Sequence, residues 1–104
     1  MSRCNHCRPV PEEVRQAADL LERRWALSIL YASIEGAVRF NEFKQALGPV
    51  PPRTLAQRLV ELEEAGVLSR VVIDARPPRV EYRLTEDGRR LVPVIEAVIR
   101  FSVR

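Results

Sequence analysis

The sequence is poor in the residues that most enzymes use, and it lacks a long apolar run. It has one histidine and two cysteines in 104 residues, and its carboxylates are scattered, so no catalytic triad or carboxylate pair can be assembled. We therefore expect no enzyme and no cofactor. No apolar stretch approaches the roughly 18 residues of a transmembrane helix, and residues 1–7 have no apolar core of a secretory signal. These absences favour a cytoplasmic protein without a membrane partner.

Positive charge is concentrated in two segments of the chain. The net charge is only +3, but residues 39–58 carry +3 and residues 70–83 carry +2, which leaves −2 for the remainder. A basic stripe confined to two segments is typical of a surface that faces phosphates. The alternative is a solvated surface with scattered arginines.

Length and hydrophobic patterning indicate one domain after a short tail. Hydrophobic residues make up 46% and charged residues 30%, which suits a single core. Pro9 and Pro11 interrupt any upstream helix, so we assign residues 1–10 to a flexible tail and residues 11–104 to the folded domain. Apolar spacing and turn residues predict helices over residues 11–23, 25–33, 41–47, 52–65 and 85–101, and strands over residues 38–40, 67–74 and 79–84.

Four residues predict where helices start, end or bend. Asn41 is a good N-cap for the third helix. Pro52 suits the first turn of the fourth helix, and Gly66 suits its end. Pro93 lies beyond the first turn of the last helix, so we expect a kink there.

The fourth helix separates an apolar face from a polar one. Leu55, Leu59 and Leu62 share one narrow arc at helical periodicity. Arginine can read guanine, and glutamine can read adenine, by paired hydrogen bonds in a DNA major groove. The opposite face is therefore a candidate for base recognition through Arg53, Thr54, Gln57 and Arg58. A helix whose outer face is only hydrated would show the same separation.

The order of elements is that of a winged helix-turn-helix, in which a short helix, a proline-started helix and two strands follow one another. We predict an α+β fold, mainly α, with a two- to three-stranded wing. Arg76 and Arg79 are candidates for phosphate or minor-groove contact, unless Arg79 pairs with Glu81 or Asp74. Near the third helix, the DNA backbone would be held by Lys44, Arg39 and Asn41.

Nine segments together resemble one family: residues 20–21, 24–25, 29–30, 39–43, 55–59, 62–66, 77–82, 84–88 and 91–94. The family is that of the HxlR-type winged-helix transcriptional regulators, related in fold to the MarR group, and the resemblance covers about residues 14–102. It implies a homodimer that binds a pseudo-palindromic operator in double-stranded DNA. Two positions depart from the family pattern, because Glu13 stands where a cysteine is usual and Phe101 where a tryptophan is usual.

The last helix carries more apolar side chains than one domain of this size needs, which indicates a partner surface. In the family that the chain resembles, the terminal helices make the dimer. The candidate interface residues are Val92, Ile95, Ile99 and Phe101.

Cys4, His6 and Cys7 form a motif that the fold does not explain. A Cys-x-x-Cys pair marks redox or zinc chemistry only in a suitable context, and no βαβ unit surrounds it. Zinc normally takes four ligands, so these three would need water or a second subunit. A thiol switch, a metal site and an inert tail all stay open.

Two other classes of protein fit parts of this pattern. A winged-helix protein-interaction module would use the same fold without binding DNA. A small redox or metal-handling protein would show thiol exchange or stoichiometric zinc. No residue pattern identifies a small-molecule effector.

Overall fold

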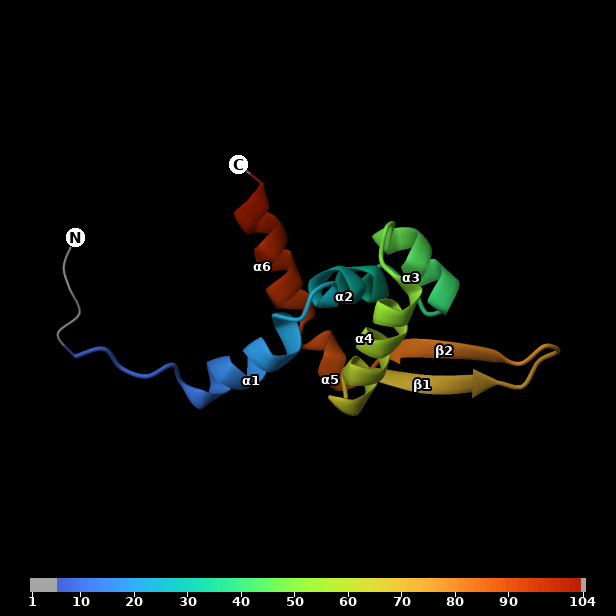
Figure 1. The fold of residues 1–104 in the computed structure, drawn as a ribbon, viewed down its shortest axis with the longest axis horizontal. Helices are drawn as coiled ribbons and strands as arrows, with labels where there is room; N and C mark the ends of the chain where they lie inside the picture. Colours follow the sequence, from blue (N-terminus) through green and yellow to red (C-terminus); the bar gives the residue numbers. More distant parts are fainter. Residues whose placement is uncertain (1–5, 104) are drawn as a thin grey trace.

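A computed structural model describes residues 6–103. These residues form six helices and one antiparallel sheet of two strands (Figure 1). The elements are α1 (Glu12–Leu21), α2 (Ala26–Ile34), α3 (Phe40–Leu47), α4 (Pro52–Glu64), β1 (Leu68–Ile73), β2 (Arg79–Leu84), α5 (Glu86–Arg89) and α6 (Val92–Ser102). The predicted fold class, mainly helical with a winged helix-turn-helix, is confirmed. Within residues 6–103, no helix is both long and apolar enough to span a membrane.

α2 lies at the centre of the structure, in keeping with its nearly continuous apolar sequence. Ile29 and Leu30 are fully buried and belong to one cluster with Phe43 of α3 and Leu59 of α4. Burial of side chains of this size contributes about 1.5–3 kcal/mol each. The aromatic side chains that pack against this cluster are Trp25, Phe40 and Tyr82. They are partly buried against the core.

α3 and α4 form the helix-turn-helix. Gly48, with a φ of 75°, ends α3, and Pro52 begins α4 after the turn. The chain leaves α4 through Gly66, whose φ of 78° favours glycine because residues with a Cβ rarely adopt it. The predicted apolar face of α4 is buried, with Leu55, Leu59 and Leu62 all in the core.

The predicted N-cap at Asn41 is wrong, because α3 begins at Phe40 and Arg39 takes the cap position. The Glu42 carboxylate accepts hydrogen bonds from the backbone N–H groups of Val38 and Arg39, both at 2.9 Å. These bonds, the one from Val38 foremost, lower the pKa of Glu42 below its ordinary value of 4.5, because they stabilise the ionised carboxylate. Asn41 instead lies exposed on the first turn.

β1 and β2 form the wing hairpin, whose register runs out to Ile73 opposite Arg79. Both strands lie within one residue of their predicted bounds. The predicted strand over residues 38–40 is wrong, because the sheet in the described part of the chain has two strands only. Val38 accepts one hydrogen bond from the Tyr82 N–H at 2.7 Å, but the chain then turns directly into α3.

The single helix predicted over residues 85–101 is two helices, α5 and α6. Thr85 caps α5, since its Oγ1 accepts a hydrogen bond from the Gly88 N–H at 2.9 Å. Pro93 lies in the first turn of α6, where its missing N–H removes no helical hydrogen bond. Pro93 therefore starts a new helix instead of kinking a long one.

α1 and the wing extend from opposite sides of the core (Figure 1). α1 has no buried residue, and its Val14 side chain is 53% exposed. Only the C-terminal end of α1 packs against the core, through Leu20 and Leu21. A helix with an uncovered apolar face is typical of one that packs on another chain.

Candidate nucleic-acid interface

The exposed side of α4 carries three of the four predicted base-reading residues. Arg53 and Gln57 are exposed, and Thr54 is half-buried. Arg53 and Thr54 lie in the first turn of the helix, at its positive end, where contact with a phosphate is also favourable. These three side chains are therefore available to a ligand that lies along the first two turns of α4.

Arg58, the fourth candidate, faces inward and is engaged within the chain. Its Nε donates to the Arg24 carbonyl at 2.9 Å, and its Nη1 donates to Glu61 Oε1 at 3.2 Å. Glu61 Oε2 accepts from Arg23 Nη1 at 2.9 Å and from Gln57 Nε2 at 3.4 Å. We call Arg23, Gln57, Arg58 and Glu61 the Glu61 cluster. Through it, the end of α1 is tied to α4.

The Glu61 cluster changes the role expected for Arg58. The side chains of Arg58 and Glu61 are only 18% and 22% exposed, and a guanidinium with two internal acceptors has fewer donors left for a base. Glu61 follows Gln57 and Arg58 on the same polar face, at the four- and three-residue spacings of helical neighbours, but this spacing alone did not indicate that it holds Arg58 inward. The hydrogen bond from Arg23 to Glu61 could not be predicted from local sequence spacing, because 38 positions separate the two residues.

The corner between α1 and α2 is fixed at the same place. Trp25 has a φ of 77°, a left-handed conformation that is uncommon for residues other than glycine. The Arg24 guanidinium lies 5.2 Å from the centroid of the Trp25 ring, within the range of a cation–π contact. Because Arg58 donates to the Arg24 carbonyl, this corner is held against α4.

The wing presents three exposed arginines without an ion pair among residues 6–103, Arg70 of β1 and the two predicted contact residues. Arg76 and Arg79 are exposed, and neither forms an ion pair within residues 6–103. Glu81, an alternative partner for Arg79, instead accepts from Arg83 Nε at 3.0 Å and from Arg83 Nη2 at 2.8 Å. The pairing of Arg79 with Glu81 or Asp74 is therefore absent from this structure.

The other predicted contact residues lie on α3 and in the N-terminal segment. Lys44 and Asn41 are exposed on α3, and Arg39 is half-buried at its start. His6 and Cys7 are exposed, while Cys4 lies outside the described residues. No group of three or more potential metal ligands gathers among residues 6–103.

The candidate dimer residues of α6 divide into two groups. Ile95 is only 4% exposed and belongs to the core of its own chain, and Val92 is half-buried. Ile99 and Phe101 are exposed, Phe101 at 84%. The part of α6 that is uncovered therefore lies toward its C-terminal end.

These elements define a winged helix-turn-helix protein of the kind found among transcriptional regulators. The sequence matches the HxlR-like helix-turn-helix family over residues 20–103, and the chain belongs to this family. It is a helix-turn-helix transcriptional regulator and not an enzyme. The family resemblance carried by these sequence segments is thereby confirmed.

Relatives with known sequences or structures are similar over most of the chain. YvaP of Bacillus subtilis (strain 168), an HTH-type transcriptional regulator, is 38% identical over 87 residues, which cover 84% of this chain and 81% of that protein. YdeP, a second such regulator from the same organism, is 44% identical over 82 residues, or 79% of this chain and 64% of that protein. The redox regulator HypR in its oxidized form is 36% identical with a TM-score of 0.81, covering 88% of this chain and 97% of that chain.

Proposed function

We propose that this regulator binds a double-stranded DNA operator, with α4 in the major groove and the wing on the flanking backbone or minor groove. The observation that carries the proposal is the pairing of an exposed polar face on α4 with the uncompensated wing arginines Arg76 and Arg79. The net charge of the residues outside the two basic segments is negative, so the excess positive charge lies in the segments that carry these residues. DNA binding also agrees with a cytoplasmic location.

The side chains of this surface divide into two roles. Arg53, Thr54 and Gln57 would contact base edges, because they are the accessible side chains on the first two turns of α4. Arg58 would orient the helix through the Glu61 cluster. The residues that hold phosphates and set the register would be Arg76, Arg79, Lys44, Arg39 and Asn41.

We propose a homodimer held by the terminal helices. Val14 of α1 and Phe101 of α6 leave apolar surface exposed that one chain does not cover. A two-fold axis between the copies would present two α4 helices to half-sites about 34–36 Å apart, one turn of DNA. The operator would then be pseudo-palindromic.

The test is fluorescence anisotropy with a labelled DNA fragment from upstream of the protein's own gene, with random DNA as competitor, at two salt concentrations. Specific binding that weakens with salt is the expected result.

Gln57→Ala should lower the operator-to-random affinity ratio about tenfold. Arg76→Ala should weaken binding to both DNAs alike and reduce the salt slope by about one. Arg89→Ala, an exposed arginine outside both basic segments, is the control.

The same assay separates this proposal from a protein-interaction module. An unchanged affinity ratio in Gln57→Ala would remove that residue from base recognition. If selection from a random DNA pool also yields no specific site, and the protein binds a protein partner independently of salt, the winged helix serves as an interaction module.

We also propose that the cysteine pair makes DNA binding responsive to thiol oxidation, because the similar protein HypR is a redox regulator. Starting from protein that has first been reduced, diamide would take two electrons and two protons from the two thiols as the disulfide forms. We expect treatment with diamide to change DNA affinity in the wild type, and not in a Cys4→Ser, Cys7→Ser double variant. A response that persists in the double variant excludes the pair. Stoichiometric zinc in the purified protein would support the metal alternative instead.

A further inference from the structure

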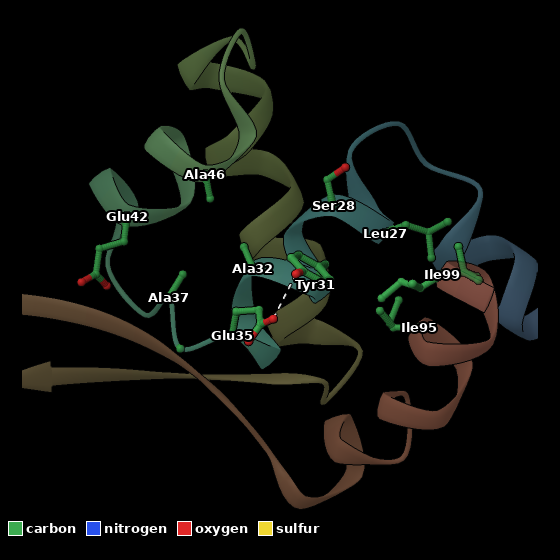
Figure 2. A pocket seen from close by; sticks show the side chains of 12 residues that line it. Leu27, Ser28, Tyr31, Ala32, Glu35, Ala37, Glu42, Ala46, Ile95 and Ile99 are labelled. Carbon is green, nitrogen blue, oxygen red and sulfur yellow. Dashed lines mark hydrogen bonds between the residues drawn. The ribbon is translucent and has the colours of Figure 1, made fainter. Parts of the chain in front are cut away.

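A cavity of about 650 Å³ lies where α2, α3 and α6 meet (Figure 2). Its walls are mainly apolar, with Leu27 and Ala32 from α2, Ala46 from α3, and Ile95 and Ile99 from α6. This volume is in the range of about 300–1,000 Å³ that is usual for small-molecule sites. The cavity is separate from the exposed face of α4, since no residue of α4 or of the wing lines it.

Tyr31 of α2 and Glu35, the residue that follows α2, both line the cavity. The Tyr31 hydroxyl donates a hydrogen bond to Glu35 Oε1 at 3.0 Å, drawn as a dashed line in Figure 2. This bond, together with the negative charge of Glu35, raises the pKa of Tyr31. The Tyr31 side chain is 46% exposed, so its ring remains accessible to a bound molecule.

The charge of the cavity wall is of one sign. Glu35 and Glu42 line it, and no arginine or lysine of residues 6–103 does, although the chain has 17 of these residues. The Glu42 carboxylate is already held by two backbone N–H groups and points away from Tyr31 in Figure 2. Glu35 is therefore the carboxylate that a ligand in the cavity would meet.

We propose that this cavity binds a small lipophilic cation, an amine or quaternary ammonium with an apolar body. The apolar body would contact the aliphatic side chains of α2 and α6, and the cationic group would lie over the Tyr31 ring beside Glu35. A cation is attracted both by the face of an aromatic ring and by a carboxylate. An anion of the same shape would be repelled by Glu35.

The cavity touches two elements with different proposed roles. α3 belongs to the helix-turn-helix, and α6 is a candidate dimer helix, so an occupant would contact both. A change in DNA affinity on binding of the cation would depend on the proposed function. Binding of the cation to the cavity would not depend on it.

The experiment is an NMR titration of the full chain with three probes that share one apolar body: 3-phenylpropyltrimethylammonium, 3-phenylpropanol and 3-phenylpropanoate. We expect saturable shifts at Tyr31, Ala46 and Ile99 with the cation. Its affinity should exceed that of the anion by about tenfold or more, with the alcohol between them. Glu35→Gln should reduce the affinity for the cation to about that for the alcohol. Glu96→Gln, an exposed α6 glutamate outside the cavity wall, should leave it unchanged.

Three outcomes would overturn the proposal. They are equal affinity for the three probes, a preference for the cation that persists in Glu35→Gln, and an absence of saturable shifts at the cavity. The last would also result if a second copy of the chain fills the cavity in the dimer. Because the titration contains no DNA, its outcome is independent of the DNA-binding assay.

Discussion

Two halves of this chain differ in how far they bury apolar side chains and pair charged ones. One half is the helix-turn-helix with the wing, and the other consists of the terminal helices α1 and α6. In the helix-turn-helix and wing, α4 buries its leucines, and Glu61 pairs with Arg58 on α4 and with Arg23 in the turn after α1. In the terminal half, α1 has no buried residue, and Phe101 at the end of α6 is mostly exposed. The first half is complete within one chain, whereas the second leaves surface for another molecule.

Folding and assembly therefore depend on separate residues in this protein. The free energy of unfolding of one chain should depend mainly on α2, α3 and α4. The exposed apolar side chains of the terminal helices, such as Val14 and Phe101, should affect it little while controlling association. Each of the variants below tests this division in one of the two halves.

The largest effect, on the free energy of unfolding, is expected at the centre of α4. Leu59 is fully buried, so Leu59→Ala should lower the free energy of unfolding by about 2–5 kcal/mol through lost burial and a cavity. Val14→Ala on α1 is the matched control and should cost about 0.5 kcal/mol or less. Guanidinium denaturation at low protein concentration, where dimerisation contributes least, measures both. Equal costs would show that α1 is part of the folding unit after all.

The next effect concerns association. Phe101→Ala should raise the dissociation constant of the dimer about tenfold, as expected for a large aromatic side chain at an interface. The unfolding midpoint of the monomer should stay unchanged, because Phe101 covers little of its own core. Sedimentation equilibrium measures the constant. Val72→Ala, an exposed apolar residue on the wing, is the control, and an equal loss there would argue against α6 as the interface.

Much of the fold followed from local signals in the sequence. Pro52 and Gly66 marked the ends of the α4 region, and the alternating residues of the hairpin marked both strands, because these signals act within a few residues. The errors arose where two local signals compete. Residues 38–40 have strand-forming side chains, but the Glu42 carboxylate caps their backbone and starts α3 instead. Pro93 can kink a helix or begin one, and its sequence position alone does not distinguish the two.

Less of the candidate site could be predicted, since it depends on elements that are distant in sequence. The exposed face of α4 was evident from periodicity. The inward turn of Arg58 was not, because its acceptor, the Arg24 carbonyl, belongs to another element. The cavity at Tyr31 and Glu35 had no signal at all, since it exists only where α2, α3 and α6 converge.

The Glu61 cluster connects the two halves, and its removal should have effects of opposite sign. Glu61→Gln should lower the free energy of unfolding by about 0.5–1 kcal/mol, as is usual for partly exposed ion pairs. It should also tighten DNA binding a few-fold, because a negative charge leaves the DNA-facing helix and Arg58 regains donors. Denaturation and anisotropy give the two values.

Glu64→Gln is the control for charge alone, since Glu64 is exposed on the same helix and forms no ion pair within residues 6–103. A double-mutant cycle between Arg23 and Glu61 isolates the contact between the turn after α1 and α4. If that coupling is zero, the cluster does not connect the two halves.

The smallest effect, on the thermal unfolding midpoint, is expected at the start of α3 and depends on pH. Glu42→Ala removes the carboxylate that caps Val38 and Arg39, so at pH 7 the thermal unfolding midpoint should fall by a few degrees. The pKa of Glu42 is lowered in the folded chain. The stability that it contributes is therefore present above its ordinary value of 4.5 and is lost as the pH falls through the lower folded value. The midpoints of wild type and variant should converge in acid, while those of wild type and Glu96→Ala should keep a constant difference. A gap that persists at low pH would mean that Glu42 acts through its aliphatic stem and not its charge.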